Sequence, residues 1–306
     1  ISSAASDVYK RQEEVPDIEA TIERNVAVAM LSKAADGHRV GFEADYVSVS
    51  LLEKLREACP DGVTLVPVSG VIEDIRLTKD NVELTRLTEA AELSVRALDE
   101  LLSAGELRAG RTEREVAADL EYRMRVLGAE RVSFDTIVAS GPNSAKPHHG
   151  AGDRVIAEGD LVTIDFGMHR LGFNSDMTRT FAIGEIGSLE REIYQVTLTA
   201  QLAGVKAAVT GAKLADVDKA CRDVIEDAGY REYFVHSTGH GVGLDVHEAP
   251  SAAKTGEGTL AEGMTLTIEP GIYIPGRAGV RIEDTLIITA AAPKVITDYT
   301  KDLTVL

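Results

Sequence analysis

The chain has 306 residues and a formal net charge of −18. This length allows two domains with a sizeable core, and the acidity argues against nucleic acid or an anionic membrane as a partner, because both are polyanions. Two cysteines, Cys59 and Cys221, are too few for a disulfide framework or a thiolate zinc site. We therefore expect a reducing, cytoplasmic location.

The opening segment, residues 1–17, lacks the hydrophobic stretch of a secretory signal. No apolar run in the chain approaches the ~18 residues of a membrane-spanning helix. Because the sequence does not begin with methionine, we expect a fragment or a non-native leader.

Residues 18–79 are expected to form a small α/β unit. The predicted elements are a strand at 39–44, a helix over 47–59 and a strand over 63–70. We expect this unit to belong to an N-terminal domain, residues 1–78.

A long helix is predicted to begin after Asp80. Asp80 followed by Glu83 is typical of a capping box, and apolar residues then recur at steps of three and four. The same pattern at Thr112 and Glu115 predicts a second helix. We place the second domain over residues 79–306, beginning just before the first of these helices.

Strands are predicted to dominate after residue 130, interrupted by helices near 188–208 and 214–228. A short internal repeat lies among the strands: residues 159–165 (GDLVTID) match residues 263–269 (GMTLTIE). Each copy ends on an acid and is followed, after a turn, by a strand with a second acid. Two such hairpins related by a pseudo-two-fold axis would bring four carboxylates to one point.

The acids of this repeat and one histidine form a candidate metal site. The set comprises Asp165, Asp176, His240, Glu269 and Glu283. Asp165 and Glu269 end apolar runs, where a buried carboxylate is costly unless paired or metal-bound. Four carboxylates and an imidazole suit two divalent ions, Mn²⁺ first and Co²⁺ or Zn²⁺ as alternatives. Two such ions can activate water and polarise a carbonyl for amide hydrolysis.

Further histidines lie near this set in the sequence. His240 stands in GHGVG, which does not match the GxGxxG of a dinucleotide loop. His236 and His247 lie on either side of it and are candidates for a supporting role. His148 and His149 follow Pro147 in a predicted turn, and residue chemistry alone does not choose between them.

The motifs DFG-x8-D, HSTGHGVGLDVHEAP, EPGIY and VRIED together resemble the pita-bread metallopeptidases, specifically the aminopeptidase P and prolidase branch. The resemblance covers about residues 80–306. It implies an α+β fold with a pseudo-two-fold pita-bread catalytic domain, preceded by a partial α/β creatinase-like N-terminal domain. Residues 18–79 resemble the later part of that domain, so we expect its start to be missing. The resemblance also implies a homodimer.

By that resemblance the two metal ions share the carboxylates of Asp176 and Glu283. Asp165 completes the first metal site, and His240 with Glu269 completes the second.

The resemblance also implies catalytic roles. Glu269 would shuttle a proton from water to the proline nitrogen. His148, which matches the family's first catalytic histidine, would stabilise the oxyanion together with His247. Three further residues would support substrate and ligands, namely His236, Tyr273 and Arg281.

The implied substrates are peptides with proline in the second position. The sequence favours aminopeptidase P activity over the alternative, an Xaa-Pro dipeptidase (prolidase). Methionine aminopeptidases share the five ligands, but the extra N-terminal domain, His236 and Arg281 argue against them. A non-catalytic pita-bread binding protein and a metal-free enzyme resembling creatinase are further alternatives, and the intact ligand set argues against both.

Overall fold

The computed structural model describes residues 24–306. The chain divides into two compact units, the first ending at Ile72 and the second running from Glu73 to Leu306. The domain boundary between residues 78 and 79 stays a prediction. The interpretation of residues 1–17, and the start of the unit predicted from residue 18, lie outside the described residues.

The first unit contains the expected strand, helix and strand. Its elements are α2 (Val26–Leu31), β1 (Arg39–Glu43), α3 (Val49–Glu57) and β2 (Thr64–Val68), and α4 (Val71–Leu77) follows. The two strands pair in parallel, with Arg39 opposite Thr64. Helix α3 begins where the Ser48 hydroxyl accepts a hydrogen bond from the Leu51 amide.

Four long helices belong to the second unit. They are α5 (Asn81–Ser103), α6 (Glu113–Val126), α7 (Ser188–Ala207) and α8 (Leu214–Asp227). Both predicted capping boxes are present, Asp80 with Glu83 at α5 and Thr112 with Glu115 at α6. None of the described helices is both long and apolar enough to cross a membrane.

The strands of the second unit are short. They are β3 (Arg131–Val132), β4 (Ile137–Ser140), β5 (Leu161–Phe166), β6 (Met168–Arg170), β7 (Phe173–Asn174), β8 (Met177–Ala182), β9 (Gly239–Gly241), β10 (Glu248–Ala252), β11 (Thr265–Ile268), β12 (Gly271–Ile274), β13 (Ala278–Arg281), β14 (Asp284–Ile287) and β15 (Lys294–Val295). They form three three-stranded sheets, ordered β4-β5-β8, β11-β14-β15 and β3-β6-β7, and two two-stranded sheets, β9 with β10 and β12 with β13.

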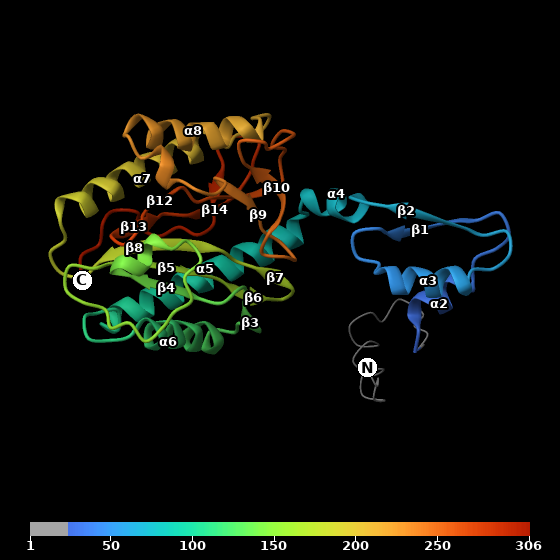
Figure 1. The fold of residues 1–306 in the computed structure, drawn as a ribbon, viewed down its shortest axis with the longest axis horizontal. Helices are drawn as coiled ribbons and strands as arrows, with labels where there is room; N and C mark the ends of the chain where they lie inside the picture. The colour runs from blue at the N-terminus through green and yellow to red at the C-terminus, as the bar shows by residue number, and fades with distance from the viewer. Residues whose placement is uncertain (1–23) are drawn as a thin grey trace. The chain divides into compact units, whose positions relative to one another are not determined.

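The second unit shows the internal symmetry that the repeat predicted. Each half runs through a strand, a short hairpin and an antiparallel return strand: β5, β6–β7 and β8, then β11, β12–β13 and β14. Helices α5 and α6 cover the first half and α7 and α8 the second, with the strands between the two helix pairs (Figure 1). The fold is therefore α+β.

The two halves differ in register. Asp165 pairs with Thr178 across β5 and β8. In the second half Thr285, the counterpart of Thr178, pairs with Thr267 rather than with Glu269, the counterpart of Asp165. The short repeat therefore predicted the paired strands but not their alignment.

Candidate metal and catalytic centre

The four predicted acids converge on one cavity of the second unit. Asp165 lies in β5, and Asp176 directly precedes β8. Glu269 directly follows β11, and Glu283 directly precedes β14. All four line a cavity of about 460 Å³. Each half of the pseudo-symmetric unit thus contributes two carboxylates.

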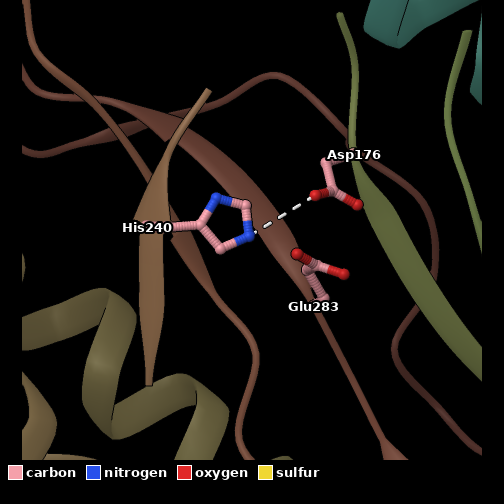
Figure 2. Close-up of side chains that lie close together, drawn as sticks. All are labelled: Asp176, His240 and Glu283. Carbon is pink, nitrogen blue, oxygen red and sulfur yellow. Dashed lines mark ion pairs between the residues drawn. The ribbon is translucent and has the colours of Figure 1, made fainter. Parts of the chain in front are cut away.

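His240 lies among these acids. Potential ligand atoms of His240, Asp176 and Glu283 lie within 4.8 Å of one another, and Figure 2 shows the three side chains directed toward a common point. His240 Nε2 is 3.6 Å from Asp176 Oδ2 and 3.3 Å from Glu269 Oε1. Because His240 Nδ1 donates to the Gly241 carbonyl at 2.9 Å, Nε2 is the ring nitrogen directed at the acids.

The glycines on either side of His240 allow its strand to lie this close to its neighbours. A Cβ atom at Gly239 would come within 1.8 Å of the Thr267 carbonyl oxygen, and one at Gly241 within 2.2 Å of the Ala249 carbonyl oxygen. Any larger residue would push β9 away from β11 or β10. The GHG motif is therefore explained by packing around the histidine.

The carboxylates of the cavity repel one another. Burial and then Glu283 and Asp165 raise the pKa of Asp176 well above its usual value. Burial and then Glu269 and Asp165 do the same for Glu283. Glu269 differs: burial, the largest single cause, would raise its pKa, but the hydrogen bond to His240 and the nearby positive charges, Arg281 among them, together lower it. A bound cation would relieve this repulsion.

The donors present fit divalent cations. Asp165 Oδ1 is buried and has no hydrogen-bond partner within residues 24–306, whereas its Oδ2 accepts from Arg281 at 2.7 Å. A cation would satisfy this costly orphan oxygen. Carboxylate oxygens with one imidazole suit Mn²⁺, Co²⁺ or Zn²⁺. The residues able to hold such ions are Asp165, Asp176, His240, Glu269 and Glu283.

A hydrogen-bonded chain lies behind the acids. His236 Nδ1 donates to the Ser237 carbonyl at 2.8 Å, so its Nε2 accepts from the Tyr273 hydroxyl, also at 2.8 Å. Arg281 donates to the same hydroxyl at 2.8 Å and to Asp165. Burial lowers the pKa of His236 and raises that of Tyr273 to about 12. These hydrogen bonds fix the Asp165 carboxylate and leave the His236 ring at the cavity wall.

His148 and His149 both line the cavity but differ in their contacts. They belong to a segment that we call the histidine loop, residues 140–152. His149 Nε2 lies 2.7 Å from Glu113 Oε2. His148 is exposed and makes no hydrogen bond with any described residue. Of these two histidines, only His148 therefore has both ring nitrogens without a partner among the described residues. His247 is also exposed at the cavity, and its ring centroid lies 4.3 Å from that of His240.

Sequence reasoning missed a buried ion pair on α8. Asp218 Oδ1 accepts from the Thr238 amide at 3.2 Å and hydroxyl at 3.0 Å. Arg222, bound to Asp218 at 2.8 Å, donates to the His236 carbonyl at 2.9 Å. The pair holds the segment that carries His236. An Asp–Arg pair four residues apart on the apolar face of a helix, beside Cys221, was the available signal.

Comparisons with known proteins agree with this fold. Residues 85–290 match the model of metallopeptidase family M24, and residues 4–78 match the creatinase/prolidase N-terminal domain. An Xaa-Pro dipeptidase of Pyrococcus furiosus is 43% identical over 257 residues, which are 84% of this chain and 73% of that protein.

Solved structures of related proteins are also similar to this chain. An Xaa-Pro dipeptidase from Bacillus anthracis has a TM-score of 0.93 and 40% identity, covering 99% of this chain and 85% of that one. An X-Pro aminopeptidase from Thermotoga maritima has a TM-score of 0.90 and 34% identity, covering 98% and 86%.

The fold and the acidic cavity define a metal-dependent hydrolase with a creatinase-type N-terminal domain and a pita-bread domain. The chain belongs to metallopeptidase family M24. Membership of this family implies divalent metal ions.

Proposed function

We propose that the chain is a metal-dependent Xaa-Pro dipeptidase, a prolidase, which hydrolyses the bond before proline in dipeptides. The observation that carries this proposal is the similarity to proteins named Xaa-Pro dipeptidase, at 43% identity in sequence and a TM-score of 0.93 in structure. The sequence alone favoured aminopeptidase P, which becomes the second candidate because an X-Pro aminopeptidase is also similar, at 34% identity.

We further propose that two ions occupy the cavity, with Mn²⁺ preferred over Co²⁺ or Zn²⁺ because the ligand set is rich in carboxylates. The five residues that would hold them are Asp165, Asp176, His240, Glu269 and Glu283. When bound, such ions acidify water and polarise a carbonyl. A homodimer and a cytoplasmic location stay predictions, the first testable by analytical ultracentrifugation and the second by fractionation of cells.

The side chains around the cavity would perform the remaining steps. Glu269 takes a proton from the attacking water and delivers it to the proline nitrogen as the amide bond breaks. His148 and His247, both exposed at the cavity, donate hydrogen bonds to the oxygen that gains negative charge in the transition state. His236, which also lines the cavity, contacts the substrate, and Arg281 keeps Asp165 oriented.

The test is hydrolysis of Gly-Pro and of Gly-Pro-Ala by protein stripped with EDTA, before and after addition of Mn²⁺. We expect cleavage of Gly-Pro only, and only after metal is added. Cleavage of Gly-Pro-Ala after glycine would establish the aminopeptidase P alternative. Failure on both substrates with metal bound would overturn the proposal.

A further inference from the structure

One buried carboxylate collects hydrogen bonds from along the histidine loop. Glu113, the first residue of α6, has no exposed surface. Its Oε1 accepts from the amide and hydroxyl of Ser140, both at 2.8 Å, and from Asn143 Nδ2 at 3.0 Å. Its Oε2 lies 2.7 Å from His149 Nε2 and 3.3 Å from the Gly152 amide nitrogen. The two carboxylate oxygens thus connect the beginning of the loop to its end.

Glu113 is not needed to start its own helix. The capping box of α6 consists of Thr112 and Glu115, whose side chains satisfy the first amides. A buried carboxylate is costly to desolvate, and every hydrogen-bond partner of this side chain within residues 24–306 comes from the histidine loop. The contacts of Glu113 therefore organise the loop rather than the helix.

The opposite side of the loop is held by the other half of the domain. The Gly279 amide of β13 donates to the Ser144 hydroxyl at 2.8 Å. Arg281 donates to the Pro147 carbonyl at 3.3 Å, one residue before His148. Between these contacts and those of Glu113, His148 is the residue whose side chain stays free at the cavity.

We propose that Glu113 is a positioning residue for peptide hydrolysis. By binding His149 and the ends of the loop, it fixes the backbone from which the His148 imidazole reaches the substrate, and His149 itself takes no part in the chemistry. This inference rests on the proposed function, because it assumes that His148 contacts the substrate.

A double-mutant cycle tests this role. We would measure kcat and KM on Gly-Pro with Mn²⁺ for Glu113→Gln, His148→Ala and the double variant. Glutamine keeps the shape of glutamate, but only one of its two terminal atoms, the amide oxygen, can accept hydrogen bonds. We expect Glu113→Gln to lower kcat about tenfold with a smaller change in KM. In the His148→Ala background the same substitution should change kcat by less than about twofold, because Glu113 acts through His148.

The matched control is Glu115→Gln on the same helix. It removes a negative charge from the first turn of the helix and weakens the capping contact without touching the histidine loop, so it should lower the melting temperature slightly and leave kcat unchanged. Hydrogen exchange of residues 140–152 supplies a readout independent of activity. It should rise in Glu113→Gln and not in Glu115→Gln. If Glu113→Gln fails to fold, His149→Gln breaks the same contact from the loop side and should show the same dependence on His148.

Equal losses of kcat in both backgrounds, or unchanged exchange of the loop, would overturn the inference. So would full activity of His148→Ala. If the unmodified protein cleaves neither peptide, the proposed function fails. The exchange comparison then still decides whether Glu113 holds the loop.

Discussion

Removal of the Arg281 charge should lower the free energy of unfolding, and bound metal should make this loss smaller. The Arg281 side chain is 3% exposed. It donates to Asp165 at 2.7 Å and to the Tyr273 hydroxyl at 2.8 Å. It also donates to the Thr178 hydroxyl at 3.1 Å and to the Pro147 carbonyl at 3.3 Å. In Arg281→Met these acceptors lose their donor while most of the side-chain volume is kept.

The size of the expected loss of stability follows from the burial of the Arg281–Asp165 ion pair. Removing one partner of a buried ion pair costs about 3–5 kcal/mol. The Asp165 side chain is 14% exposed, so we expect the lower end, about 3 kcal/mol, in the metal-free protein. A cation bound at Asp165 would replace the lost positive charge, and the loss should therefore be smaller with Mn²⁺.

The assay is urea unfolding of the unmodified protein and of Arg281→Met, each in EDTA and in Mn²⁺. Arg277→Met is the control, since Arg277 is an exposed arginine in the turn of the same β12–β13 hairpin, and it should change the free energy of unfolding by no more than about 0.5 kcal/mol. A loss below about 1 kcal/mol for Arg281→Met in EDTA would contradict this prediction. An equal loss with and without metal would also refute it.

Three further predictions follow from the site and its loop. Asp176→Ala should lose both its bound metal, measured by elemental mass spectrometry, and its peptide hydrolysis. An active, metal-free variant would contradict the metal assignment. Gly279→Ala places a Cβ atom 2.1 Å from the Ser144 carbonyl oxygen, so thermal unfolding should show a loss of about 1–3 kcal/mol, and an unchanged stability would argue against this packing. Burial alone would raise the pKa of Glu113, but the hydrogen bonds that it accepts from the histidine loop, including that of His149, together lower this pKa below 4.5. This carboxylate therefore stabilises the fold above pH 4.5, and its contribution is lost as the pH falls through the lowered pKa. The stability gap to Glu113→Gln, measured by urea unfolding, should shrink on acidification, and a widening gap would contradict the sign.

Local signals in the sequence predicted helix α3 of the first unit and the four long helices of the second, but not α2 or α4. The capping pairs at Asp80 and Thr112 each begin a helix at the next residue. The internal repeat also predicted that two hairpin halves would bring four acids together, because both the apolar strands and the acids at their ends recur. These features depend on neighbours in the chain.

The features that the sequence did not reveal depend on contacts between distant residues. The register of β11 against β14 is set by packing across the domain and not by the repeat. The different environments of His148 and His149 follow from Glu113, more than thirty residues earlier in the chain. The role of Arg222 requires α8 to lie against the segment that carries His236. No spacing rule connects these positions.

The most direct test of the metal assignment is a titration of the stripped protein with Mn²⁺, following bound metal and Gly-Pro hydrolysis in the same samples. We expect two ions to bind per chain and hydrolysis to rise with their binding. We also expect Glu283→Ala, which removes a carboxylate proposed to bind both ions, to lose binding and hydrolysis together. Full hydrolysis in EDTA, or undiminished metal binding by Glu283→Ala, would contradict the metal assignment.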